Sequence, residues 1–101
     1  MSKNHIKIIA KVWKYPGKAG WYFVTLPKRK SIEIEKIFGE FKRGWGSLKV
    51  HVTVGKTKWK TSIFPDRKIG SYLLPIKSII REKEGIKIND RITLLLQIKW
   101  W

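Results

Sequence analysis

The chain of 101 residues contains no cysteine, seven acidic residues and two histidines. The absence of cysteine excludes a disulfide framework and a thiolate metal site. Two histidines and scattered carboxylates form no cluster with the spacing of metal ligands, so we predict neither a metal nor another cofactor. No apolar run approaches the roughly 18 residues that span a bilayer, and no apolar block follows the N-terminus. We therefore expect a cytoplasmic protein that does not bind membranes.

Lysine and arginine, in contrast, number 23 and give a formal net charge of +16. Such a charge draws polyanions toward the protein. Eighteen of these residues are lysines, which act as point charges and favour contacts with a phosphate backbone over recognition of single bases. A proteome rich in lysine and isoleucine is an alternative origin of the charge, but it usually raises glutamate as well. With five glutamates, the chain fits that explanation only in part.

The length predicts one domain, spanning residues 1–101, with a single core. Alternation of apolar and polar residues predicts a mainly β protein. We expect six strands, at residues 5–15, 21–26, 48–54, 57–64, 71–74 and 91–99, and two short helices, at 31–38 and 76–84. Ser31 is the expected N-cap of the first helix and Pro75 opens the second, while Gly39 and Gly85 end them.

An internal echo relates two parts of the chain. Residues 24–31 lead from a strand through Leu-Pro into a helix, and residues 72–79 do the same 48 positions later. A further strand follows each helix. The echo predicts a barrel built from two similar halves that are related by a pseudo-two-fold axis.

Several motifs carry a resemblance that covers most of the chain. They lie at residues 21–27 (WYFVTLP), 44–50 (GWGSLKV), 61–65 (TSIFP) and 70–77 (GSYLLPIK), followed by Arg81, Gly85-Ile86 and Asn89-Asp90. In this order and spacing they resemble the family called domain of unknown function 1905, from about residue 6 to residue 98. The resemblance implies a small closed six-stranded double-split β-barrel with two short helices. This fold is similar to a single-chain version of the barrel of the swapped-hairpin AbrB-type DNA-binding regulators.

Residues 74–92 by themselves are similar to the repeating unit of those regulators. Both patterns usually carry Gly-Asp where this chain has Asn89-Asp90, and asparagine tolerates a positive φ, so we expect the turn to be retained. The family has no established activity or binding site, so the resemblance carries over no functional residue. Likeness of fold to DNA-binding regulators does not by itself imply their function.

No pattern in the chain predicts catalysis. His51 lies at an outward strand position, and nothing in the sequence pairs it with a nucleophile. The closely spaced carboxylates fall on different faces of their helices, at Glu33 and Glu35 and at Glu82 and Glu84. Residues 44–46 (Gly-Trp-Gly) lack the third glycine and the preceding strand of a dinucleotide-binding loop. We predict that the protein is not an enzyme.

Basic residues follow both strands of one predicted hairpin. Lys56, Lys58 and Lys60 line one face of its second strand. Lys49 and His51 lie on the outer face of its first strand. We predict that these five residues bind nucleic acid, because such a surface can follow a phosphate backbone by charge alone. The solvated outer face of a barrel is an equally good interpretation of the same pattern.

Six tryptophans are many for a chain of this length. Trp21 and Trp59 share strand faces with other apolar residues, so we expect both in the core. For Trp45 we favour packing over a barrel end to a stacking role with bases. Trp13 is expected to be partly exposed. The two tryptophans at 100–101 either fray, plug a barrel mouth or form a dimer contact.

A second candidate site is an anion pocket formed by Arg43, Tyr72, Lys77 and Arg81. Lys77 and Arg81 lie four residues apart, on one face of the predicted helix. We favour a structural role instead, in which Arg81 forms an ion pair with Glu84 or Asp90.

The sequence thus predicts a monomeric, non-catalytic binding module that holds nucleic acid or another polyanion on its basic strand face. The alternative is a protein-interaction or scaffold domain of unknown partner, with Trp13 and residues 100–101 as contacts. A third interpretation is a small anion held near Tyr72, Lys77 and Arg81.

Overall fold

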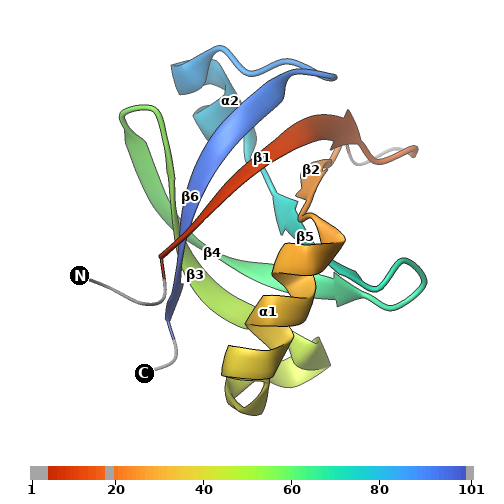
Figure 1. Ribbon diagram of the computed structural model, residues 1–101. Coiled ribbons are helices and arrows are strands. Elements are labelled where there is room, and N and C mark those ends of the chain that lie inside the picture. The colour runs from red at the N-terminus through yellow and green to blue at the C-terminus, as the bar shows by residue number, and fades with distance from the viewer. Residues whose placement is uncertain (1–4, 18–19, 100–101) are drawn as a thin grey trace.

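Six strands close into an antiparallel barrel in the computed structural model of the protein, which describes residues 5–17 and 20–99 (Figure 1). The strands are β1 (His5–Lys14), β2 (Tyr22–Thr25), β3 (Leu48–Val54), β4 (Thr57–Asp66), β5 (Ser71–Pro75) and β6 (Arg91–Lys99). The helices α1 (Lys28–Phe38) and α2 (Ser78–Glu84) lie at opposite ends of the barrel in this view, and the 3₁₀ turns η1 (Gly39–Phe41) and η2 (Gly44–Gly46) follow α1. Around the barrel the order is β1-β2-β5-β4-β3-β6. The predicted mainly β barrel with six strands and two short helices is confirmed.

Alternation along the strands fills the barrel with apolar side chains. Most inward residues of β1, β3 and β6 are buried: Ile8, Ala10, Val12, Leu48, Val50, Val52, Val54, Leu94, Leu96 and Ile98. Ile6 and Ile92 are partly buried against them. Val24 of β2, Ile63 of β4 and Leu74 of β5 complete this interior, each with no exposed surface. Because the interior is filled, a ligand must bind on the outer surface of the barrel.

The two halves of the chain repeat one plan, as the internal echo predicts. Each half runs strand, strand, helix, strand, and exchanging the halves leaves the order around the barrel unchanged. The Leu26 N–H donates to the Tyr72 carbonyl (2.9 Å), and the Ile76 N–H donates to the Tyr22 carbonyl (2.8 Å). These two bonds are related by a shift of 50 positions, whereas the sequence echo has a shift of 48. A difference of two residues leaves every side chain of a strand on the same face.

α1 begins earlier than predicted and α2 begins later, because contacts with distant strands decide their first turns. α1 begins before Ser31, with Pro27 at its N-cap. Ser31 is buried, and its hydroxyl oxygen accepts a hydrogen bond from the Tyr72 N–H (3.0 Å) instead of capping the helix. Pro75 is the last residue of β5 and does not open α2, since the next residue, Ile76, still bonds to β2.

Two turns next to β6 follow the sequence prediction. Gly85 ends α2 in the left-handed conformation, with a φ of 62°. Asn89 also has a positive φ, of 73°, where the related patterns carry glycine. Its N–H donates to the Val12 carbonyl, and the Val12 N–H donates to the Asp90 carbonyl, both at 2.8 Å. The turn is therefore tied to β1.

Candidate functional site

Four side chains of the β3–β4 hairpin form what we call the basic face: Lys49, His51, Lys58 and Lys60. His51 lies directly opposite Lys60 in the antiparallel register. Lys49 and Lys58 occupy outward positions two residues before them on their strands. The three lysines are exposed and His51 is half-buried. Lys56, the fifth residue of the predicted site, is exposed in the turn between the two strands.

The outer surface of β6 and β1, the next strands around the barrel, carries further cations and polar groups. On β6, Gln97 lies opposite His51 and Lys99 lies opposite Lys49. β1, which pairs with the other edge of β6, adds Lys7 at an exposed position. A sheet surface of four strands thus presents cations and neutral polar groups to the solvent, together with the exposed apolar side chains of Ile9 and Leu95.

The seven carboxylates come mostly from outside these strands, and one of them, the Glu84 carboxylate, bonds to Thr57 beside Lys56 in the β3–β4 turn. They belong to α1, η1, α2, the last residue of β4 and the turn before β6: Glu33, Glu35, Glu40, Asp66, Glu82, Glu84 and Asp90. The outward positions of β1, β3 and β6, and those of β4 from Lys58 to Phe64, carry no carboxylate. A surface that serves only solubility usually intersperses the two signs of charge. Here these strand positions carry cations without carboxylates, whereas α1 and α2 carry both signs.

His51 is neutral at pH 7 despite its position among cations. Its partial burial lowers its pKa below the ordinary value of 6.5, and the charges of Lys99 and Lys60 lower the pKa further. The imidazole therefore acts as a hydrogen-bonding group within a field of positive charge.

The basic face is hollowed, with two shallow depressions that meet at His51 and Lys60. The first, of about 460 Å³, is also lined by Phe64 and Lys77. The second, of about 380 Å³, extends along β4 to Lys58. Lys77, which the sequence placed in a separate anion pocket, thus lies beside the basic face.

The structure separates the other residues of the predicted anion pocket. Tyr72 is buried beside α1, whereas the guanidinium of Arg81 lies over the Tyr22 ring, 3.6 Å from its centroid. Arg43 is exposed ahead of η2 and lines neither depression of the basic face. Arg81 and Lys77 remain neighbours on α2 and its N-cap.

Arg81 has a structural role, but with other partners than we predicted. Its Nε–H donates to the Ile76 carbonyl (3.2 Å), and its charge faces the Tyr22 ring. Within residues 5–17 and 20–99, no ion pair joins it to Glu84 or Asp90. The Glu84 carboxylate accepts the Thr57 hydroxyl instead, at 2.5 Å.

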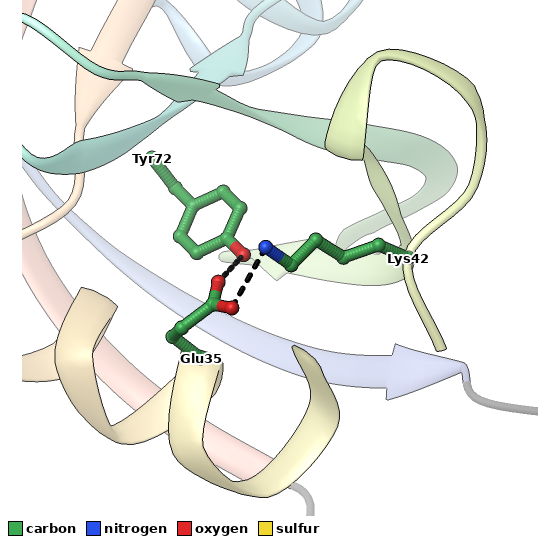
Figure 2. Close-up of polar contacts among 3 residues, drawn as sticks. All are labelled: Glu35, Lys42 and Tyr72. Atoms are coloured by element: carbon green, nitrogen blue, oxygen red, sulfur yellow. Dashed lines mark hydrogen bonds and ion pairs between the residues drawn. The ribbon is translucent and has the colours of Figure 1, made fainter. Parts of the chain in front are cut away.

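Tyr72 belongs to a polar network that joins α1 to the barrel (Figure 2). Its hydroxyl donates to Glu35 at 2.8 Å, and the Lys42 ammonium forms an ion pair with the same carboxylate at 2.7 Å. The hydrogen bond from Lys42 lowers the pKa of Glu35, and the bond from Tyr72 adds to this effect against the opposing effect of desolvation. Burial, and then the bond to Glu35, raises the pKa of Tyr72. With Glu35 ionised and Tyr72 protonated, the network has a structural role and joins α1 to β5.

The tryptophans differ from the prediction at one position. Trp21 is 54% exposed, so its expected place in the core is wrong. Trp59 is partly buried against the core, and Trp13 is partly exposed, as expected, with its indole N–H donating to the Thr25 hydroxyl (2.9 Å). The side chain of Trp45 and residues 100–101 lie outside the described part of the chain.

Sequence reasoning missed Phe64 and Lys99, which lie beside the basic face, and Trp21, which lines a hollow with Phe64 and Lys77. For Phe64 and Lys99 the signal was present, because each continues the outward alternation of its strand. Trp21 lies just before the first residue of β2, where alternation no longer decides which way a side chain points. Among the described residues, no three His, Asp or Glu side chains are grouped to hold a metal ion, and no helix is long and apolar enough to cross a membrane.

These features define a class: a small six-stranded β-barrel with two similar halves, a filled interior and a cationic outer surface. Residues 9–96 match the family described as Domain of unknown function (DUF1905), and the chain belongs to this family. No curated protein matches the chain.

Proposed function

We propose that the protein is a non-catalytic binding module for polyanions, and for nucleic acid in particular, which it holds through the basic face. The observation that carries the proposal is a strand surface with cations and no carboxylate. Lysines occupy outward positions of adjacent strands, whereas the carboxylates lie on helices that also carry cations, in a turn and at the end of β4. Lys49 lies opposite Lys99 of β6, about 5 Å away across the sheet, and diagonal to Lys60 of β4, so several lysines can meet consecutive phosphates.

The chemistry of the basic face favours binding over catalysis. Its groups are ammonium ions and one neutral imidazole, without a carboxylate to orient the imidazole or to share a proton with it. Nucleophilic and acid–base catalysis both need such an oriented pair. We propose that the domain acts as a cytoplasmic monomer.

The salt dependence of binding tests this proposal. The site offers about five phosphate contacts, from Lys49, Lys56, Lys58, Lys60 and Lys77. The logarithm of the association constant should therefore fall linearly with the logarithm of the salt concentration. The expected slope is about −4.5 for duplex DNA and about −3.5 for a single strand. Fluorescence anisotropy of labelled oligonucleotides, titrated at several salt concentrations, measures the slope. Binding that does not change with salt would contradict the proposed mechanism.

An alternative function is that of a protein-interaction domain. Aromatic side chains exposed beside β2 and β5 favour it, because a contiguous apolar patch on a protein surface marks an interaction site. The cations that flank this patch favour an anionic ligand, so we place nucleic acid first.

A further inference from the structure

An exposed group of rings lies on the outer surface of the barrel, which we call the aromatic cluster: Tyr15, Trp21, Phe23 and Phe64. They line one shallow hollow of about 430 Å³ with Leu73 and Pro75. Tyr15, Trp21 and Phe64 are exposed by 53%, 54% and 41% of their surface. The barrel interior is already filled without them, so the fold does not require these rings at the surface.

Three of the four rings, Tyr15, Trp21 and Phe23, are held in place by contacts through Phe23. Trp21 stacks on Phe23, with centroids 6.1 Å apart and an angle of 12° between the planes. Phe23 in turn contacts Trp13 at 5.2 Å and the edge of Tyr15 at 6.4 Å. More than half of Trp21 remains exposed, so a flat group can stack on it without first ordering the side chain.

The aromatic cluster is continuous with the basic face. Phe64 and Lys77 line both the larger depression of the basic face and a third hollow, of about 520 Å³, beside α2. This third hollow is also lined by Trp21 and Arg81. Trp21 and Phe64 then line the hollow of the aromatic cluster as well. A path of adjoining hollows therefore leads from Lys60 to Trp21.

Strand β4 sets the spacing along this path. Its outward residues from Lys60 to Phe64 follow each other at two-residue steps, and each step is about 6.8 Å long. The backbone of Phe64 thus lies about 14 Å along the strand from that of Lys60, the last lysine of the basic face. A short oligonucleotide can reach both.

Building on the proposed function, we propose that the ligand is a single-stranded nucleic acid, whose phosphates lie on the basic face while its bases stack on the aromatic cluster. Stacking needs the flat face of a base, and in a duplex those faces are covered by neighbouring bases. An exposed aromatic cluster beside a cationic groove is therefore suited to an unpaired strand. Every base has such a face, so this mode of binding tolerates different sequences.

Charge argues against a second copy of the chain as the occupant of the aromatic cluster. Each copy carries a net charge of +16, and Lys77 and Arg81 lie at the edge of the cluster. Closing two such surfaces on each other would bring like charges together. A phosphodiester strand neutralises them.

The test compares two oligonucleotides of about 12 residues, a thymidine strand and an abasic strand with the same sugar-phosphate backbone. Trp21→Ala should weaken binding of the thymidine strand about 5- to 100-fold at every salt concentration and leave the salt slope unchanged, because it removes stacking and no phosphate contact. It should leave binding of the abasic strand unchanged. Trp21→Phe keeps a flat ring and should retain most of the affinity, which also guards against a folding defect in the alanine variant.

Two further variants separate this inference from the proposed function. Lys58→Glu with Lys60→Glu should weaken binding of both strands and reduce the salt slope. Ile37→Ala, at a 60% exposed position on α1, is a control for the loss of exposed apolar surface and should change neither.

Four results would overturn the inference. Stacking is absent if Trp21→Ala binds the thymidine strand as tightly as wild type does, or if it weakens binding of the abasic strand by the same factor. Loss of binding in the lysine variant would then still support the basic face as a binding site. If the lysine variant binds both strands like wild type, the proposed function fails and the inference with it. If sedimentation shows wild type as a dimer and Trp21→Ala as a monomer, the aromatic cluster is a protein contact.

Discussion

Glu35 serves two partners at once, the Lys42 ammonium and the Tyr72 hydroxyl, and so connects α1 with β5 and with the segment after η1. Its side chain is half exposed. Water therefore screens the ion pair, which limits what the pair contributes to stability. Tyr72 is only 3% exposed, so its hydroxyl depends on the Glu35 carboxylate as its acceptor.

Glu35→Gln should lower the free energy of unfolding by about 0.5–1 kcal/mol at pH 7. The pKa of Glu35 in the folded protein lies below its unfolded value of about 4.5, so its carboxylate stabilises the fold above that pH. As the pH falls through the folded-state pKa, this contribution is lost and the two proteins should approach equal stability. Urea unfolding at pH 7 and at pH 3 measures the difference. An equal difference at both pH values would contradict this account.

At the scale of single elements, β4 shows what alternation can predict and where it stops. Its outward lysines and inward Ile63 follow directly from period two. The start of α1 does not follow from the local sequence. Ser31 has the sequence signature of an N-cap, but its hydroxyl bonds to Tyr72, 41 positions away. Local signals therefore predicted the strands, whereas helix starts were decided by contacts that only the closed barrel creates.

The end of α2 depends on Gly85, which has a φ of 62°. A Cβ added there meets nothing within 4 Å, so substitution costs backbone strain alone. Gly85→Ala should lower the free energy of unfolding by about 1–2 kcal/mol. Gly44→Ala is the matched control, since Gly44 also has open space around it but no positive φ, and it should be nearly neutral. Equal losses in thermal unfolding would show that the left-handed turn is not the cause.

At the scale of the whole molecule, the sequence predicted the barrel, its two halves and the five basic residues of one hairpin. It did not predict that Trp21, Phe64 and Lys77 would line adjoining hollows. These residues come from β4 and from segments beside β2 and α2, and only the order of strands around the barrel brings them together. Within the described part of the chain, the residues predicted as an anion pocket line no common hollow for the same reason, because Tyr72 and Arg81 lie against different parts of the fold.

The net charge by itself would attract a polyanion wherever the lysines lay, so the central claim is that their position matters. Lys58→Glu with Lys60→Glu changes the net charge from +16 to +12, and Lys68→Glu with Lys87→Glu makes the same change at exposed positions in turns away from the basic face. Both variants therefore experience the same loss of overall attraction. They differ only in whether the basic face is altered.

The most direct measurement compares the affinity of these two variants for one labelled oligonucleotide across a range of salt concentrations. We predict that the variant of the basic face binds at least about tenfold more weakly than the variant of the turns, with a salt slope smaller in magnitude by about two. Equal affinities and equal slopes for the two variants would contradict the account. The basic face would then be a solvated barrel surface, and the charge of the protein would not define a binding site.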